Sequence, residues 1–284
     1  MKQAILVVAF GSTVDSAREH QIDAVVNRIK EKYTDYEVRL AFSSRIIVKR
    51  LRDRGIEIPT EQGALDALIG EGYTDIYVQP LHFTGGEEFD KLKHNILNHE
   101  RAHELNTLRV GRPLVYYMGQ EEHPNDYQIL IDTFVTSLSV SNEDGLLLVG
   151  HGGLGSGNSA YGYLQYQLIR SGLNHIRVAT LENAPYVADI AVPWEWLDGK
   201  KPNKIYVHPL LLVLGDHALN DLFGDEEDSV VNVLKEAGYE VEEMHHALGE
   251  YTEIQDIYCQ HIQDCIDDIY GKRSSHRPAI PNIK

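Results

Sequence analysis

Short runs of apolar residues alternate along the chain with longer amphipathic segments. The apolar runs have the length of β-strands, and the amphipathic segments repeat apolar positions as helices do. Strands that are apolar throughout and separated by helices are typical of parallel sheets covered on both faces. The predicted strands are 4–9, 37–42, 75–83, 113–118, 145–150, 175–181, 204–214 and 239–245. The predicted helices are 15–32, 60–71, 87–105, 159–171, 218–237 and 251–271.

The order of elements occurs twice, and the sequence itself repeats. Residues 75–88 read DIYVQPLHFTGGEE, and residues 204–217 read KIYVHPLLLVLGDH. Strand ends of α/β proteins resemble one another, but several matches in one order indicate a duplicated fold. Two weaker matches keep this order, 4–13 with 145–153 and 37–44 with 175–183.

The repeat predicts an α/β protein of two similar doubly wound domains. Each is expected to hold a four-stranded parallel sheet, with the active-site cleft between the two. The first domain is predicted to span residues 1–138 and the second 139–271, with a polar linker near 137–144. The tail 272–284 carries two prolines and no periodicity, so we expect it to lie outside the fold and to be partly disordered.

The two copies differ at the residues where their strands end. Ligands of open α/β sheets bind outside the carboxyl ends of the strands, so these positions are candidates for a site. The first copy has an aromatic residue, a serine and a glutamate there, whereas the second has two histidines and a glutamate. The opposed pairs are Phe10 and His151, Ser44 and Glu182, and Glu88 and His217.

Each candidate also has a plain structural explanation. His151 lies among glycines in GHGGLGSG, while His217 and Glu88 lie at predicted helix starts, where polar residues are common. The glycines match G-x-G-x-x-G, and Glu182 follows at a spacing suited to a ribose-binding acid, which would indicate a dinucleotide site. However, the helical pattern begins only near Ser159, whereas a dinucleotide loop runs straight into its helix.

Charge and cysteine content narrow the classes of partner. The formal net charge of −17 argues against binding to nucleic acid or to anionic membranes, and is compatible with a cationic partner such as a metal ion. Cys259 and Cys265 fit no metal or redox spacing, so we expect buried thiols in a helix and a cytoplasmic, reducing location. The apolar start of the chain is too short for a signal peptide, and no run approaches the roughly 20 residues of a membrane span.

Two histidines with two carboxylates suit borderline divalent metals such as cobalt, nickel, iron and zinc. Two His and one Glu resemble a catalytic site that keeps a coordination position open. The motifs H-E-x-x-H, G-x-S-x-G and G-x-x-x-x-G-K-[ST] do not occur, which weighs against a zinc protease, an esterase and an ATPase. His82 and His208, inside the third predicted strand of each copy, are expected to be packed and hydrogen-bonded.

Four short motifs resemble the class II chelatases, and among them the CbiK-type anaerobic cobalt chelatases of cobalamin synthesis. They are a GHG at a strand end, an L-E-x-x-P turn, a G-D-H-A-x-N-D helix start and a G-E-E-F in the first half. The likeness covers about residues 1–270. Members of this family often carry a threonine and a second histidine after the GHG, where this chain has Gly153 and Gly155.

The resemblance implies an ATP-independent enzyme, a lyase that inserts Co²⁺ into sirohydrochlorin between the two halves. It implies that His151, Glu182 and His217 hold the metal, and that Glu88 faces them across the cleft. His151, Glu88 and His217 would then be the catalytic residues. No cofactor is implied beyond the substrate metal, with Fe²⁺ and Ni²⁺ as alternatives to Co²⁺.

The tetrapyrrole substrate carries many carboxylates, so an acidic protein needs local donors to bind it. The candidates for contacts to the substrate are Phe10, Ser12, Ser43, Ser44, Arg45 and Tyr161. Three other functions stay open: insertion of iron or nickel into the same or a related ring, a non-catalytic metal or haem carrier, and a nucleotide-dependent oxidoreductase. A homo-oligomer is compatible with the sequence, which does not fix the oligomeric state.

Overall fold

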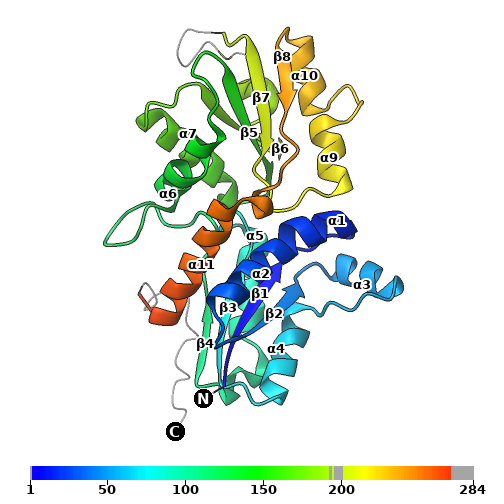
Figure 1. The fold of residues 1–284 in the computed structure, drawn as a ribbon, viewed down its shortest axis with the longest axis vertical. Helices are drawn as coiled ribbons and strands as arrows, with labels where there is room; N and C mark the ends of the chain where they lie inside the picture. The colour runs from blue at the N-terminus through cyan, green and yellow to red at the C-terminus, as the bar shows by residue number, and fades with distance from the viewer. Residues whose placement is uncertain (1, 192–193, 195–200, 270–284) are drawn as a thin grey trace.

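The computed structural model describes residues 2–191, 194 and 201–269, so the tail 272–284 lies outside the described residues. Two four-stranded sheets lie one above the other along the long axis of the molecule (Figure 1). The first has the order β2-β1-β3-β4 and the second β6-β5-β7-β8, and every pairing is parallel. The strands are β1 Gln3–Ala9, β2 Glu37–Phe42, β3 Asp75–Pro80, β4 Thr107–Val110, β5 Gly145–Gly152, β6 Ile176–Glu182, β7 Lys204–Pro209 and β8 Glu240–Glu243.

Helices cover both faces of each sheet, which explains why the central strands are apolar throughout. Residues 4–9 of β1 and 146–149 of β5 are almost completely inaccessible. The predicted fold class, with two similar doubly wound α/β halves, is therefore confirmed. The helical segments of the first half are α1 Asp15–Ala17, the π-helix η1 Arg18–Ile22, α2 Asp23–Lys32, α3 Arg45–Asp53, α4 Glu61–Gly70, α5 Glu87–Leu97, η2 Glu100–Glu104, α6 Asp126–Thr133 and η3 Val135–Leu138. Those of the second half are η4 Ser156–Asn158, α7 Ser159–Arg170, α8 Val187–Ile190, α9 Asp216–Phe223, α10 Val230–Glu236, η6 Leu248–Glu250 and α11 Thr252–Asp267.

The prediction of a strand at 113–118 is wrong, because the fourth strand of the first sheet is β4. Pro113 has no N–H group, and the residues after it leave the sheet. They remain extended and pair instead with the loop after β3, where the Leu114 amide donates to the His82 carbonyl (2.9 Å). The second half has a corresponding contact with the loop after β7, in which the amide of Leu248, the first residue of η6, donates to the Leu211 carbonyl (2.8 Å).

Other element boundaries also differ from the prediction. β3 and β7 end at Pro80 and Pro209, because the apolar residues beyond them form loops. The helix expected at 218–237 is two helices, α9 and α10, and the second begins where the Ser229 side chain accepts the Asn232 amide. The helix expected at 87–105 is α5 followed by the short η2. Helices α3 and α6 were not predicted.

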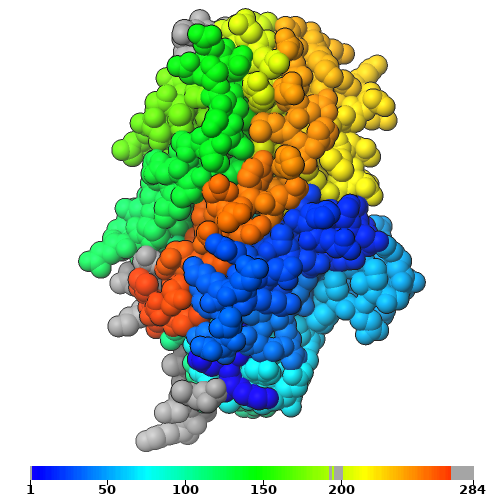
Figure 2. Space-filling view, in the orientation of Figure 1, coloured from blue at the N-terminus to red at the C-terminus, as the bar shows by residue number. Residues whose placement is uncertain are grey.

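The last helix of the chain packs against the first half rather than against its own half. In Figure 1, α11 runs beside α2 and β3, and in Figure 2 its side chains fill the seam between the two halves on the face shown. Arg28 of α2 pairs with Asp256 of α11 (2.8 and 3.1 Å), and the Tyr33 hydroxyl donates to the Cys259 carbonyl (2.7 Å). Cys259 is a buried free thiol in this helix, as expected.

The last helix of the first half makes the reciprocal exchange. Tyr127 of α6 packs edge-on against Tyr163 of α7, with ring centroids 4.7 Å apart, and Phe134 packs against His208 of β7 at 5.4 Å. One apolar core therefore continues through both halves. The boundary predicted between residues 138 and 139 separates the two sheets along the sequence. In space, α6 from before the boundary packs on the second half, and α11 from after it packs on the first.

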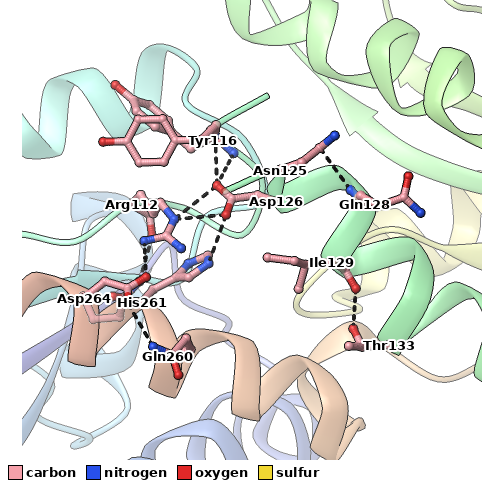
Figure 3. A network of polar contacts seen from close by, with 12 residues as sticks. Arg112, Tyr116, Asn125, Asp126, Gln128, Ile129, Thr133, Gln260, His261 and Asp264 are labelled. Carbon is pink, nitrogen blue, oxygen red and sulfur yellow. Dashed lines mark hydrogen bonds and ion pairs between the residues drawn. The ribbon is translucent and has the colours of Figure 1, made fainter. Parts of the chain in front are cut away.

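A buried ionic network joins the two exchanged helices (Figure 3). Arg112 Nε lies 3.1 Å from both carboxylate oxygens of Asp126, at the start of α6. Its Nη1 donates to Asp264 of α11 at 2.7 Å. The amides of Tyr116 and Tyr117 also donate to Asp126 (3.2 and 2.9 Å). Since all three charged side chains are buried, these contacts fix both helices relative to the 112–117 segment.

No helix within the described residues is both long enough and apolar enough to cross a lipid bilayer.

Candidate active site

The two second-half residues predicted to be metal ligands at β5 and β6 lie side by side. Gly152 of β5 is in register with Glu182 of β6, which places His151 and Glu182 at the carboxyl edge of the sheet. The distance from His151 Nδ1 to Glu182 Oε2 is 3.9 Å. Both side chains are more than half exposed, 59% and 63%, so a ligand from solvent can reach the pair.

Two glycines allow this close approach of β5 and β6, because another group occupies the space where a side chain of each would lie. A Cβ at Gly150 would overlap the Tyr161 ring, and one at Gly152 would overlap the Glu182 carbonyl oxygen. Gly152 also has a φ of +79°, a conformation that favours glycine. The glycines on either side of His151 therefore allow close packing of β5, which explains them without a dinucleotide.

Tyr161 supports the His151 loop from below and is 5% exposed. Its ring stacks on Phe83 of the first half, with centroids 5.5 Å apart and planes 15° apart. Burial raises the pKa of the Tyr161 hydroxyl to about 12, despite the opposing effect of a hydrogen bond with the Gly152 backbone. The structure places this residue in the core between the halves, and its role as a substrate contact stays a prediction.

The loop after His151 is tied to the turn after Glu182. Asn183 Nδ2 donates to the Gly153 carbonyl (3.3 Å), and the Asn158 side-chain amide donates to the Ala184 carbonyl. This turn is the L-E-x-x-P motif of the sequence. The two motifs therefore form one connected rim around the His151–Glu182 pair.

The two halves touch at glycine loops directly beside this rim. A Cβ on Gly157 would overlap the backbone of Gly86, the residue that precedes α5. This contact places the start of α5, with Glu88 exposed in its first turn, next to the loop that follows His151. The prediction that Glu88 faces the second-half residues across the cleft is compatible with this placement.

His217 is the second residue of α9 and is exposed. It makes no hydrogen bond or ion pair within the described part of the chain. The loop before it is held by two buried residues: Leu214 is 3% exposed, and the Leu210 amide donates to the Val149 carbonyl (2.7 Å). Among residues 2–191, 194 and 201–269, no three His, Cys, Asp or Glu side chains are grouped to hold a metal ion. The structure thus brings together two of the three predicted ligands.

The strand ends of the first half carry the other predicted contacts. Phe10 follows β1 and is 50% exposed, so its ring is available to a ligand. Ser12 is buried and its hydroxyl accepts the Val14 amide (3.1 Å), while the Ser44 hydroxyl accepts the Ile47 amide (3.4 Å) and caps α3. These two hydroxyls therefore have structural partners, whereas Arg45 is exposed at the start of α3.

Buried histidines near the strand ends fit the prediction in part. His208 Nε2 lies 2.9 Å from the Tyr251 hydroxyl, as expected of a packed, hydrogen-bonded residue. His82 lies just beyond β3, and both of its ring nitrogens are buried without a hydrogen-bond partner among the described residues. Burial lowers the pKa of each imidazole to about 4. Both are therefore neutral at pH 7.

Several exposed groups at this edge were missed by sequence reasoning. Leu154 is 72% exposed in the loop after His151, and Tyr186 is 48% exposed after the Glu182 turn. Farther from this edge, the last turn of α3 carries the exposed cations Arg50 and Arg52, which make no ion pair within the described residues. An apolar residue in a loop has no periodic signal, so only the fold shows its exposure.

Comparison with solved structures places this fold among known proteins. SirB from Bacillus subtilis, in a structure with Fe³⁺, is similar with a TM-score of 0.66 at 18% sequence identity, covering 96% of this chain and 98% of that one. A structure of the sirohydrochlorin chelatase SirB from Bacillus subtilis subspecies spizizenii in complex with cobalt has a TM-score of 0.60 at 15% identity, covering 97% and 100%. The duplicated α/β fold of this chain is therefore shared with these two proteins.

The sequence comparisons give the family. The model of the cobalt chelatase (CbiK) family matches residues 3–267, so the chain belongs to this family. The sirohydrochlorin cobaltochelatase of Salmonella typhimurium is 30% identical over 270 residues, covering 94% of this chain and 97% of the relative. Sirohydrochlorin cobaltochelatase CbiKC of Nitratidesulfovibrio vulgaris is 26% identical, covering 92% and 89%.

Proposed function

We propose that this protein is a sirohydrochlorin cobaltochelatase that inserts Co²⁺ into the ring without a nucleotide. The observation that carries the proposal is the exposed His151–Glu182 pair, with 3.9 Å between Nδ1 and Oε2, at the carboxyl edge of a sheet. Imidazole and carboxylate together suit cobalt. The names of the two relatives support the choice of metal and ring.

In this proposal Co²⁺ is a substrate held by His151 and Glu182, with His217 as the third ligand. Because the described residues do not group the three side chains, the exposed His217 side chain has to turn toward this pair when the metal binds. Three protein ligands leave coordination positions free for the ring nitrogens. The ion can then pass from the protein to the ring without leaving the cleft.

Insertion also removes two pyrrole protons from the ring. A histidine released from the metal accepts one proton, and Glu88, beside the His151 loop, accepts or relays the other. A ring that is held out of plane turns its nitrogen lone pairs toward the ion, and binding energy from the rest of the ring can supply this distortion.

The first half supplies the surface for the ring. The exposed Phe10 lies at the end of β1, where it can pack against a flat macrocycle. Arg45, Arg50 and Arg52 pair with no carboxylate of the described residues; Arg45 lies at the start of α3, close to the end of β2, and Arg50 and Arg52 add positive charge in its last turn. In a protein of net charge −17 such a cluster offers the ring carboxylates a local attraction. The free thiols in α11 fit a reducing, cytoplasmic location.

The test mixes purified protein with sirohydrochlorin and Co²⁺ and follows the absorption change of the ring. The protein should raise the rate well above that of metal and ring alone. H151A and E182Q should each lower kcat by about 100-fold, since each removes a metal ligand and leaves the fold intact. H123A, which alters a histidine in a different loop, is the control and should retain full activity. A rate equal to the uncatalysed one would contradict the proposal.

A second metal is favoured by one comparison. The similar SirB structure contains Fe³⁺, so insertion of iron into the same ring is the alternative reaction. Parallel assays with Fe²⁺, Co²⁺ and Ni²⁺ at equal concentrations distinguish the two, because the preferred metal should give the highest kcat/KM.

A further inference from the structure

Gln21 of the first half contacts the second half through both the oxygen and the nitrogen of its side-chain amide. It lies in the π-helix η1 and is 8% exposed. Its Oε1 accepts the Leu214 amide at 2.8 Å, and its Nε2 donates to Glu250 Oε1 at 2.9 Å. A buried amide with both groups satisfied fixes the segments that it joins, because losing either bond leaves a buried polar group unpaired.

The backbone around Gln21 is docked as closely as its side chain. A Cβ at Gly249 would overlap the Gln21 carbonyl oxygen. The π-helical turn inserts an extra residue into the helix and changes the direction in which side chains point, and such turns are frequent at functional sites. Here it directs Gln21 into the second half.

The loop that Gln21 holds is the one that leads to the proposed metal ligand on α9. Leu214 precedes His217 by three residues and is buried, and α9 begins at Asp216. The same loop is also held by η6, whose Gly249 amide donates to the Leu212 carbonyl (3.1 Å). Gln21 is therefore the first-half contact that sets the position of this loop.

Glu250 completes the contact from the second half. Its Oε1 accepts the Ala247 amide (2.9 Å) as well as Gln21, and its Oε2 lies 2.9 Å from His246 Nδ1. Burial raises the pKa of Glu250, but the hydrogen bonds from His246, Ala247 and Gln21 outweigh burial and lower it below the usual value. The group opposite Gln21 is therefore a carboxylate that requires a donor.

We propose that Gln21 is a positioning residue that holds the 210–215 loop, and with it His217, in register with the first half. Only a side chain of this length with both a donor and an acceptor satisfies the Leu214 amide and the Glu250 carboxylate together. Glutamate has no proton to donate to Glu250, and asparagine is shorter by one methylene. The inference rests on the proposed metal-binding role of His217.

The test uses Co²⁺ binding without any tetrapyrrole, measured by the visible absorption of the bound ion. Q21E places two carboxylates in contact and should weaken Co²⁺ binding about tenfold, the lower end of the effect of groups that orient metal ligands. The double variant Q21E/E250Q removes the contact between two carboxylates, but the new amide at position 250 can either donate to the new carboxylate at position 21 or accept the Ala247 amide, so the recovery should be partial. It should recover binding to within about threefold of wild type.

Q167E is the matched control, because it places a carboxylate at a buried glutamine of α7, whose amide donates to the Tyr163 hydroxyl (2.6 Å). It should lower the melting temperature and leave Co²⁺ affinity within about twofold. Should Q21E not fold, Q21N replaces it, and the same loss of about tenfold in Co²⁺ affinity is expected. If Q21N binds Co²⁺ as weakly as Q21A, which has no amide, the length of the glutamine side chain is required.

The outcomes separate this inference from the proposed function. If H217A weakens Co²⁺ binding while Q21E does not, or if Q21E/E250Q stays as weak as Q21E, Gln21 does not position the loop. If H217A itself leaves Co²⁺ binding unchanged, the metal role of His217 is wrong, and the positioning inference is overturned with it. Weak binding in Q21E, recovery in the double variant and no effect in Q167E support the inference.

Discussion

At the scale of single residues, the site depends on glycines as much as on its ligands. Gly150 and Gly152 have no side chain, so Tyr161 and the end of β6 can pack directly on the backbone at either side of His151. The third glycine in the run, Gly153, has open space where a Cβ would be and no positive φ. Two adjacent glycines thus have opposite sensitivity to substitution.

G152A should destabilise the protein by at least about 2 kcal/mol, because alanine is strained at a φ of +79° and its Cβ would overlap Glu182. The same change should weaken Co²⁺ binding by displacing Glu182 from His151. G153A should change the free energy of unfolding by less than about 0.5 kcal/mol. Urea denaturation and a cobalt titration of both variants check the prediction, and equal effects in the two variants would contradict it.

At the scale of elements, the exchange of α6 and α11 decides how the halves are held together. Arg112 links both helices through Asp126 and Asp264, and all three side chains are buried (Figure 3). Arg28 links α2 to α11 through Asp256, but the side chains of that pair are 39% and 47% exposed. The distances in the two ion pairs are similar, so their contributions to stability should differ because of burial.

R112M should lower the free energy of unfolding by about 3 kcal/mol, because it leaves two buried carboxylates without their cation. R28M should cost much less than R112M, since solvent screens the exposed pair. Chemical denaturation of the two variants side by side measures the difference. Similar losses in both would show that the buried network does not hold the exchanged helices.

Which elements could be predicted from the sequence depended on how clearly each one shows its own pattern of apolar residues. Strands β1, β3, β5 and β7 are apolar and repeated, so the duplicated parallel sheets were predictable. The 113–118 segment is equally apolar, and only tertiary pairing with the loop after β3 shows that it lies outside the sheet. Helix α3 was missed because its nine residues make it too short for a repeat of apolar positions to stand out.

The site was predictable to a similar degree. The difference between the repeats identified His151 and Glu182, which the register of β5 and β6 brings together. The role proposed for Gln21 could not be predicted, because it depends on contacts between segments far apart in the chain. Gln21 and Leu214 are 193 residues apart, and no local pattern connects them.

At the scale of the whole molecule, neutral histidines are buried in both halves. The pKa values of His82 and His208 are lowered to about 4 by burial, and that of His261 is lowered well below its usual value, mainly by burial and also by Arg112. The unfolded chain binds protons at His82 and His208 below about pH 6.5, whereas the folded chain does not until about pH 4. Stability is therefore complete above pH 6.5 and is lost as the pH falls toward 4.

H82L should reduce the loss of stability between pH 7 and pH 5 by about 2 kcal/mol, because it removes one imidazole whose pKa differs between the two states. Leucine suits the position because both ring nitrogens of His82 lack partners among the described residues. H20L, which alters an exposed histidine, is the matched control. Urea denaturation at the two pH values checks this, and an unchanged pH dependence in H82L would contradict it.

The position of α11 has a consequence for synthesis on the ribosome. The first sheet is complete at residue 110, but the helix that covers part of it ends at Asp267. At the usual rate of about 5–20 residues per second, the apolar surface of the first sheet stays exposed for on the order of ten seconds or more before α11 has been made. Nascent chains should therefore engage chaperones throughout this interval. A stop codon placed just before α11 would yield a product that aggregates, although both sheets and the proposed metal ligands would already have been translated.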